Sequence, residues 1–463
     1  MFKKILPVIL IVLLLPLAGF GCKGISAEQA AATKPVTLEF WTVYDDVDAL
    51  QALIDKYKAD RPYLTVNLKQ LRSDEFDSRL VNALAEDQGP DIISIQNKAV
   101  PYYQTKLASM PASVKDTTVS VTKNAIGGTD TAVNINTQVL PAPLDVNREY
   151  VQAVGKDVIL DGKVYGLPLS LDNLALYYNK DLLDKAGIPE VPQTWQDFQA
   201  AVKKLTKFDK ATGKIIQSGA ALGTGNNIPG FDDLLYVLFR QSGLSFVSTN
   251  GYTAFNIVPS SGVGANGTPA MSVMDFFTDF SNPLRDTYTW NESMGNALDE
   301  FVNGELAFYF GYSFDYPTIK ARAPQLNFEI LPMLQLNPEQ PVNVANYWVQ
   351  AVTLKSKHQN EAWSLINYLA HSKATKDYLD QADRPSALRT YIGGQMDKPE
   401  LAPFASQVLI SESWYKGKNY TVASQALADM LHQWLLTPPD ANRINEWRQS
   451  ILDRAAARVN QTL

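Results

Sequence analysis

The sequence has few of the residues that disulfides and metal centres require. Its 463 residues include one cysteine, Cys22, and only three histidines. A single thiol cannot form an intramolecular disulfide. The histidines, which are His358, His371 and His432, stand far apart, and none has a second histidine or a cysteine at ligand spacing. We therefore expect no dedicated metal site and no cofactor.

An excess of basic residues is also absent. The chain has 41 Lys and Arg against 48 Asp and Glu, which gives a formal net charge of −7. Nucleic-acid binding depends on clustered Lys and Arg that neutralise phosphates, so this balance argues against it. With 46% hydrophobic residues the chain does not have the composition of an intrinsically disordered protein. At roughly 150 residues per domain, its length suggests two or three globular units.

One long hydrophobic run is present, and it lies at the N-terminus. Two lysines lie among residues 1–4, and residues 5–19 are almost purely apolar, which is short for a membrane span and typical of a secretory signal. Cys22 follows this run, and the site resembles the lipobox of bacterial lipoproteins, although Gly19 and Phe20 depart from the usual pattern. We expect a signal peptide at 1–22, a lipid anchor on Cys22 and a flexible tether at 23–35. An uncleaved anchor or an incidental buried cysteine is the alternative, and in either case the rest of the chain lies outside the cytoplasm.

Beyond residue 35, strand-like and helix-like segments alternate. Residues 36–41, 64–68 and 90–95 have the composition of strands, and 48–57 and 75–84 have apolar residues at helical spacing. This alternation predicts an α/β fold with a mostly parallel sheet. In such sheets ligands bind beyond the carboxyl ends of the strands, so the loops after Phe40, Ile95 and Leu169 are the places to look.

The middle of the chain gives a less regular pattern. Residues 111–147 have weak periodicity, and we expect helix plus loop there. A tight turn at Asp161-Gly162 joins two short strands, a strand is expected at 173–178 and a helix at 181–186. A further helix runs from Trp195 to about 207 and is capped by Thr194. We find no internal repeat.

Long motifs in this region resemble the extracellular solute-binding proteins of ABC importers, in the sugar-binding group that includes maltose-binding protein. The strongest stretch is Asp161-Gly-Lys-Val-Tyr-Gly-Leu-Pro-Leu-Ser-Leu-Asp172, and it continues through Asn173-Leu-Ala-Leu-Tyr-Tyr-Asn-Lys-Asp-Leu-Leu183 to Pro192-Gln-Thr-Trp195. Supporting matches are Leu38-Glu-Phe-Trp41, Gly89-Pro-Asp-Ile92, Phe301-Val-Asn-Gly-Glu-Leu-Ala307 and Ala351-Val-Thr-Leu-Lys-Ser-Lys-His358. The resemblance covers nearly everything after residue 35.

The resemblance implies a two-lobed periplasmic-binding-protein-like fold with discontinuous lobes, a hinge and an interlobe ligand cleft. We expect one lobe from 35–172 and 341–388 and the other from 173–340 and 389–463. Closure of the hinge around a ligand would present a changed outer surface to a transmembrane permease. The implied partners are a small solute, expected to be a sugar, the permease of an ABC transporter, and the membrane through the lipid anchor. A monomer is expected.

Candidate ligand-binding residues are aromatic and polar side chains near strand ends and in the loops that the resemblance marks. Aromatic faces suit the C–H groups of a sugar, and carboxylates and amides suit its hydroxyls. Asp172 and Tyr312 match family positions that commonly hold an acidic and an aromatic contact. The full set is Trp41, Tyr44, Asp45, Gln96, Asp172, Asn226, Tyr312, Tyr347, Trp348 and Trp414. Each aromatic could instead pack in a core, and Arg384 could face the cleft or form an ion pair.

Two motifs formally suggest other kinds of binding site, and we adopt neither interpretation. Gly262-Val-Gly-Ala-Asn-Gly267 matches a dinucleotide fingerprint formally, but Pro259 precedes it and Pro269 delays the helix, so a surface loop is the better interpretation. The acidic run from Asp45 to Asp48 lacks the rest of a calcium-loop pattern and fits a helix start.

We conclude from the sequence that the chain is a membrane-tethered solute-binding protein that captures a small polar solute for an ABC permease and is not an enzyme. An exported glycoside hydrolase is the rival from another class, because paired carboxylates in a sugar cleft could also cleave. A surface protein that uses the same fold for sensing or scaffolding is a third possibility.

Overall fold

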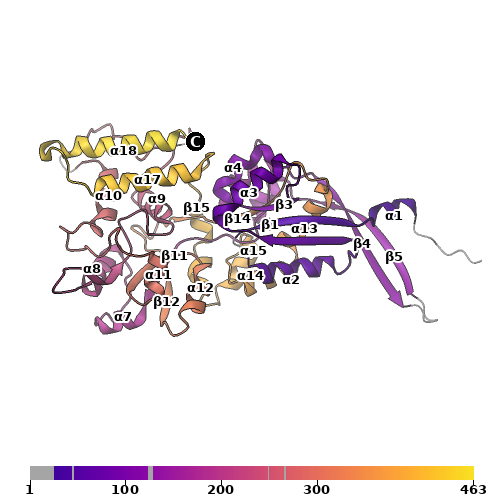
Figure 1. Cartoon of the computed structure of the whole chain (residues 1–463), viewed down its shortest axis with the longest axis horizontal. Helices are drawn as coiled ribbons and strands as arrows, with labels where there is room; N and C mark the ends of the chain where they lie inside the picture. Colours follow the sequence, from indigo (N-terminus) through magenta and orange to yellow (C-terminus); the bar gives the residue numbers. More distant parts are fainter. Residues whose placement is uncertain (1–25, 44–45, 124–128, 249, 265–266) are drawn as a thin grey trace, which may run out of the picture.

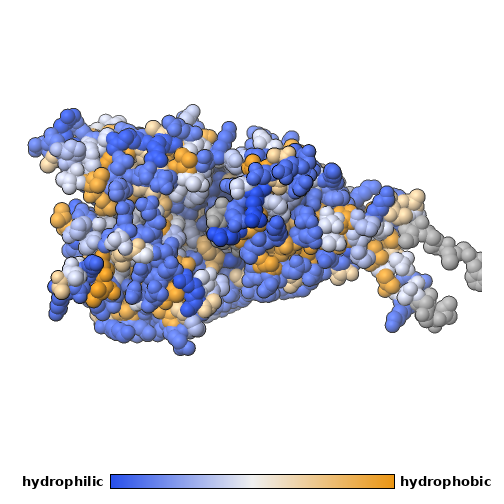
Figure 2. All heavy atoms as spheres, viewed as in Figure 1, coloured by the Kyte–Doolittle hydropathy of each residue, from blue (hydrophilic) through white to orange (hydrophobic). Residues whose placement is uncertain are grey.

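The computed structural model describes residues 26–43, 46–123, 129–248, 250–264 and 267–463. The expected signal peptide, Cys22, the start of the tether, Tyr44 and Asp45 lie outside the described residues. Within the described part of the chain, no helix combines the length and the apolarity that a membrane crossing needs. The face in Figure 2 is mostly hydrophilic, with apolar residues scattered over it.

The first lobe is built around a four-stranded sheet in the order β14-β3-β1-β2. Its strands are β1 (Val36–Thr42), β2 (Leu64–Gln70), β3 (Ile92–Gln96) and β14 (Trp348–Val352). β1 pairs in parallel with β2 and β3, and β14 runs antiparallel to β3. The helices of this lobe include α2 (Val47–Lys58), α3 (Ser73–Ala85), α13 (Gln359–His371) and α14 (Lys373–Gln381). The three strands predicted at 36–41, 64–68 and 90–95 are thus confirmed as neighbours in one sheet.

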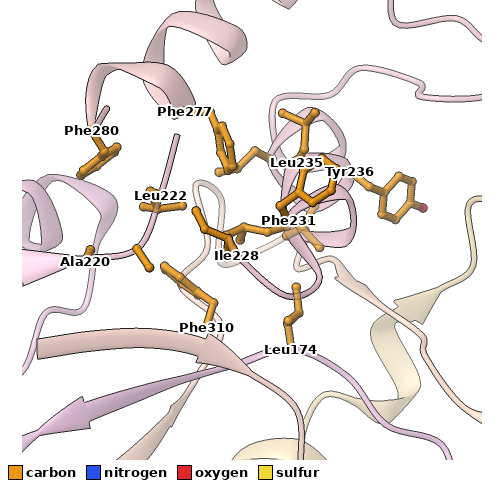
Figure 3. Packing of buried hydrophobic residues seen from close by; sticks show 14 of the residues in the cluster. Leu174, Ala220, Leu222, Ile228, Phe231, Leu235, Tyr236, Phe277, Phe280 and Phe310 are labelled. Carbon is orange, nitrogen blue, oxygen red and sulfur yellow. The ribbon is translucent and has the colours of Figure 1, made fainter. Parts of the chain in front are cut away.

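The second lobe has a five-stranded mixed sheet in the order β12-β8-β11-β10-β9. Its strands are β8 (Ala175–Asn179), β9 (Lys207–Phe208), β10 (Ile215–Ala220), β11 (Leu306–Gly311) and β12 (Phe328–Pro332). The longer helices are α8 (Trp195–Leu205), α9 (Phe231–Gln241), α10 (Pro269–Asp279), α17 (Tyr420–Trp434) and α18 (Ile444–Asn460). Figure 3 shows apolar side chains of α9, of α10 and of the segment after β10 gathered in one cluster above the sheet strand that carries Phe310, β11.

Shorter elements connect these layers. They are α1 (Ala27–Ala32), η1 (Asn97–Ala99), α4 (Val100–Tyr103), η2 (Gln104–Lys106), α5 (Pro143–Glu149), α6 (Gln152–Val158), β6 (Ile159–Leu160), β7 (Lys163–Val164), α7 (Lys180–Lys185), α11 (Ala297–Val302), α12 (Asp315–Arg322), β13 (Asn343–Val344), α15 (Arg389–Gln395), α16 (Ala402–Ala405), η3 (Val408–Ile410), β15 (Ser411–Glu412) and η4 (Ala441–Arg443). β6 and β7 are joined by the predicted Asp161-Gly162 turn, in which both residues have positive φ.

Two separate hydrophobic cores match the two sheets. The first core draws on residues 38–171 and 345–392, and the second on 174–344 and 414–459, with the segment between 404 and 408 contributing to both. The chain crosses between the cores beside the bridge between Asp172 and Asn346. Because Ile392 still packs in the first core, we propose that the third crossing lies later than the expected boundary at residue 388.

The expectation of helix plus loop at 111–147 is wrong for most of that segment. β4 (Ser113–Lys123) and β5 (Thr129–Val139) pair as a long antiparallel hairpin, and a helix, α5, begins only at Pro143. Thr and Val dominate these strands, and β-branched residues favour extended chains. Figure 1 shows the hairpin projecting from the end of the first lobe, on the side away from the second lobe.

Candidate functional site

Two adjoining cavities lie where the two lobes face each other. One has a volume of about 440 Å³ and is lined by lobe 1 residues together with residues 417–421. The other has a volume of about 400 Å³ and lies mainly against lobe 2. Both are lined by Gln96, at the end of β3, and by Tyr420, at the start of α17. We call the pair of cavities the interlobe cleft.

The larger cavity of the interlobe cleft is lined by aromatic side chains. Trp348 opens β14 and lies opposite Gln96 in the antiparallel pairing with β3, which brings both residues to the same sheet end. The aromatic residues that line this cavity are Phe76, Tyr102, Tyr103, Trp348 and Tyr420. Asp77, on α3, also lines it and accepts a hydrogen bond from the Tyr103 hydroxyl. This cavity can therefore offer apolar ring faces to a ligand.

The smaller cavity is lined by amides, hydroxyls and carboxylates together with apolar side chains such as Phe231 and Phe314. Its polar lining residues are Gln96, Asn226, Asp232, Asp233, Asn296, Tyr312, Asp315, Asn346, Tyr420 and Ser424. Gln96 donates to Asn346 Oδ1 at 2.9 Å, so the lobe 1 strand end and the crossing segment are joined at the cavity wall. Such a lining can donate to and accept from the hydroxyl groups of a polar ligand.

A buried ion pair closes the base of the cleft. Lys98 Nζ lies 2.5 Å from Asp233 Oδ1, and the two side chains are 0% and 1% exposed. Asp233 also accepts hydrogen bonds from Trp414 Nε1 at 2.8 Å and from the Tyr312 hydroxyl at 2.6 Å. A buried charge is tolerated when it is paired and hydrogen-bonded, and this arrangement meets both conditions.

Two further carboxyl groups at the cleft have raised pKa values. Burial raises the pKa of Asp232, against the attraction of the nearby Lys98 ammonium. Burial also raises the pKa of Asp315 to about 6, although the Tyr312 backbone N–H and the Tyr309 hydroxyl donate hydrogen bonds to it. Asp315 therefore changes its charge in the pH range between about 4 and 7.

Four of the residues expected at the site lie in the cleft. Gln96 and Trp348 line the aromatic cavity, and Gln96, Asn226 and Tyr312 line the polar one. Asn226 stands in the glycine-rich loop before α9, as the sequence suggested for a cleft lip. These four come from different parts of the chain, and the fold brings them together.

Four others lie outside both cavities. Trp41 is half-buried at the end of β1, with Lys69 Nζ 5.2 Å from its ring centroid. The Tyr347 hydroxyl donates to Asp157 Oδ2 at 2.7 Å, which places Tyr347 in the interior. Trp414 is 3% exposed and lines a separate cavity of about 760 Å³ beside β15.

Asp172 is the fourth residue outside the cavities, and it lies at the crossing between the lobes. It accepts hydrogen bonds from the Ser313 hydroxyl at 2.7 Å and from the backbone N–H groups of Ser313 and Asn173. Arg384 Nη1 lies 4.0 Å from Asp172 Oδ2, and both side chains are largely buried, so this ion pair lies in the interior and not at the surface as the sequence suggested. Burial raises the pKa of Asp172, and Arg384 opposes that rise.

Several cleft residues were not expected from the sequence. Lys98 was missed because nothing in the local pattern distinguishes it from a surface lysine. Asp232 and Asp233 open a strongly apolar helix, and a pair of acids at a buried helix start is the signal that could have found them. Tyr102 and Tyr420 carry no such signal. Among the residues that the structure describes, no group of three or more His, Cys, Asp and Glu is placed to hold a metal ion.

Comparison with protein families gives a match over most of the chain. The family described as bacterial extracellular solute-binding protein matches residues 52–391. A protein of Brucella abortus (strain 2308), named only as a binding protein, is 25% identical over 266 residues, which is 55% of this chain and 60% of the relative. The chain thus spans about 60% of the length of that curated relative.

Relatives with more specific names match over shorter stretches. The maltodextrin-binding protein of Bacillus subtilis (strain 168) is 27% identical over 258 residues, which cover 52% of this chain and 56% of the relative. The arabinooligosaccharide-binding protein of Halalkalibacterium halodurans is 27% identical over 180 residues, covering 39% and 36%.

Solved structures agree on the fold. The cyclic α-maltosyl-1,6-maltose binding protein from Arthrobacter globiformis superposes with a TM-score of 0.69 at 19% identity, covering 92% of this chain and 98% of that one. A cyclo/maltodextrin-binding protein complexed with maltotetraose gives a TM-score of 0.66 at 14% identity, covering 92% and 97%.

Proposed function

The chain belongs to the bacterial extracellular solute-binding proteins, and from that premise we propose that its interlobe cleft captures a carbohydrate for delivery to the permease of an ABC transporter. The family consists of binding proteins, so the chain is a binding protein rather than an enzyme, and its place is outside the cytoplasm, in the periplasm or at the surface. The choice of ligand class and the delivery step are the proposal.

The observation that carries the ligand class is the mixed lining of the cleft. Rings such as those of Tyr102 and Trp348 stand beside amide, hydroxyl and carboxyl groups in its walls. A sugar ring has both kinds of surface, because its C–H groups form apolar faces and its hydroxyls lie around the edge. The names of the maltodextrin-binding and arabinooligosaccharide-binding relatives support the same class.

We further propose that the protein works as a monomer held at the membrane by a lipid on Cys22. Residues 27–32, within the segment expected to be a flexible tether, form the capped helix α1, and Gln29 of this helix donates to the Val133 carbonyl of the hairpin. A lipid on Cys22 would therefore hold lobe 1 at the membrane.

The test is a binding measurement with two matched tryptophan variants. We expect maltotetraose or an arabino-oligosaccharide to bind the full chain in isothermal titration calorimetry. Trp348→Ala removes an indole from the aromatic cavity and should weaken that binding by roughly tenfold or more. Trp41→Ala removes an indole from the end of β1, two strands away from β14 in the same sheet and outside both cavities, and should leave the affinity within about twofold.

The two variants separate the possible outcomes. Equal losses in both would mean that the binding surface extends to β1 and that the cavities do not define it. No binding of either oligosaccharide by the wild-type chain, together with binding of a non-carbohydrate solute, would overturn the ligand class and leave the family assignment unchanged.

A further inference from the structure

The ion pair between Lys98 and Asp233 joins the two lobes. Lys98 lies in η1, directly after β3 of lobe 1, and Val100, two residues later, packs in the first core. Asp233 lies in the first turn of α9, and Phe231 and Leu234 of that helix pack in the second core. The two residues are 135 positions apart in sequence. We call this contact the interlobe ion pair.

Each partner is fixed to its own lobe. The backbone of the segment that carries Lys98 is held by the Asn97 N–H, which donates to the Tyr347 carbonyl at 2.9 Å. Asp233 is held by the N-terminal turn of α9, where a helix favours negative charge. A change in the angle between the lobes would therefore pull the ammonium and the carboxylate apart.

Lobe 2 side chains surround the Lys98 ammonium. Its Nζ lies 3.1 Å from the Tyr420 hydroxyl, 4.5 Å from the centre of the Tyr420 ring and 5.7 Å from the centre of the Trp414 ring. The Tyr420 hydroxyl in turn donates to Asp232 Oδ2 at 2.5 Å. The backbone of Lys98 therefore belongs to lobe 1, and its ammonium contacts α9, α17 and the segment before α17.

We propose that the interlobe ion pair holds the two lobes in the arrangement seen here and that Lys98 is the positioning residue of the cleft. The side chains of the pair are buried, so their effect on a solute acts through the relative position of the aromatic and polar cavities. This role goes beyond solute capture and does not depend on which solute the cleft takes.

The physical basis is the cost of a buried charge without a partner. If Lys98 lost its charge, Asp232 and Asp233 would remain as neighbouring buried carboxylates in the arrangement seen here. Separation of the lobes would admit water to both groups and relieve that cost. Loss of either charge should therefore shift the population towards more separated lobes.

The experiment measures the distance between the lobes directly, without any solute. One nitroxide label is placed on α3 of lobe 1 through Ser78→Cys and one on α17 of lobe 2 through Val422→Cys, in a full chain in which Cys22→Ser removes the native thiol. Electron-spin distance measurements then give the distribution of interlobe distances. We expect one dominant distance for the charged pair, and in Lys98→Met we expect that peak to lose more than about half of its amplitude to longer distances.

Two more variants keep the test decisive. Asp233→Asn removes the other charge and should shift the distances in the same direction, so the result does not depend on one substitution that misfolds. Lys106→Met is the matched control, because Lys106 also lies beside aromatic rings, 4.4 Å from that of Tyr102 and 5.4 Å from that of Tyr103, but these are rings of its own lobe.

A distribution that stays unchanged in folded Lys98→Met and folded Asp233→Asn would overturn the proposal. An equal shift in Lys106→Met would do the same, since it would show that any lysine of this segment has that effect. Because no solute is present, failure of the carbohydrate assignment would leave these distances unaffected, and the two proposals can fail separately.

Discussion

At the scale of single residues, Asp315, a carboxyl group of the smaller cavity, should make the stability of the fold depend on pH. Burial raises its pKa to about 6, from an ordinary value near 4. A group whose pKa is higher in the folded state stabilises the fold at low pH, and this stabilisation is lost as pH rises through the folded-state pKa. The relevant window here runs from about pH 4 to pH 7.

We predict that Asp315→Asn costs less stability at high pH than at low pH. Between pH 4.5 and 7.5 the wild-type chain loses the stabilisation that the raised pKa of Asp315 provides. The variant has no titrating group at position 315 and loses no such stabilisation. The difference in unfolding free energy between the two should shrink by about 2 kcal/mol over this range, measured by urea denaturation at both pH values.

The opposite trend serves as the control for Asp315. A hydrogen bond from Lys203 lowers the pKa of Asp286, which is exposed, so the stabilisation by that group is present at neutral pH and lost as pH falls. The gap between wild type and Asp286→Asn should stay nearly constant between pH 4.5 and 7.5 and shrink only at more acidic pH. A gap for Asp315→Asn that is constant across the range would show that its carboxyl titrates normally.

The sequence predicted only some of the residues that line the cleft. Hydrogen bonds explain why other predicted residues lie elsewhere. Gln96 and Trp348 could be predicted because strand ends and the carboxyl edge of a sheet follow from the local pattern. Tyr347 is adjacent to Trp348 and equally aromatic, but its hydroxyl bonds to Asp157, a residue 190 positions away. Contacts at that sequence separation decide which of two neighbouring rings faces the cleft, and a single sequence does not contain them.

At the scale of elements, helices with both a cap and an apolar stripe were the most predictable. α2 begins after Asp46, whose carboxylate accepts from the Ala49 N–H, and it buries Leu50, Leu53, Ile54 and Tyr57 as the spacing predicted. The β4–β5 hairpin was not predicted, because the parts of its two strands nearest the loop are exposed on both faces. Without a buried face, the alternation of apolar and polar residues that marks a strand is weak.

The start of α8 gives a prediction at this scale. The Thr194 hydroxyl accepts from the Asp197 N–H at 3.1 Å, and the Asp197 carboxylate accepts from the Thr194 N–H at 3.2 Å, which forms a reciprocal cap. Thr194→Ala removes half of this cap and should lower the unfolding free energy by about 1 kcal/mol in chemical denaturation.

Thr194→Ser is the matched control, since it keeps the hydroxyl and should retain most of the stability. Solute affinity should be unaffected in both variants, because Thr194 is outside the cleft cavities. Equal destabilisation by Ala and Ser would mean that the methyl group of Thr194, and not its hydroxyl, stabilises the helix start.

At the scale of the whole molecule, the resemblance to solute-binding proteins predicted two lobes, and the structure has two sheets with two cores. The motifs at Asp172 and before β14 are the basis on which we propose the first two crossings, and the second core extends to Val344, a few residues beyond the expected boundary at residue 340. The third could not be placed from sequence, because α15 and α16 have no long apolar stripe that assigns them to one core.

Membrane attachment is a property of the whole chain and is tested in cells. If Cys22 carries the lipid, Cys22→Ser should move the processed protein from the membrane fraction to the soluble fraction, as judged by fractionation and immunoblotting. Cys22→Ser protein that stays in the membrane fraction with residues 1–21 still attached would instead indicate an uncleaved anchor.

The contact between α1 and the hairpin determines how force would pass through the molecule. Gln29 Nε2 donates to the Val133 carbonyl at 2.9 Å, and Lys115 Nζ lies 3.6 Å from Glu28 Oε1, so the start of the described chain is attached to β5 and β4. Figure 1 places this attachment at the end of lobe 1 away from lobe 2. A load applied at residue 26 would therefore enter lobe 1, through β1 and through the hairpin, and would bypass the hinge. Lobe 1 would stay in place relative to the anchor while lobe 2 moves, so opening and closing of the cleft would not require the anchored segment to move.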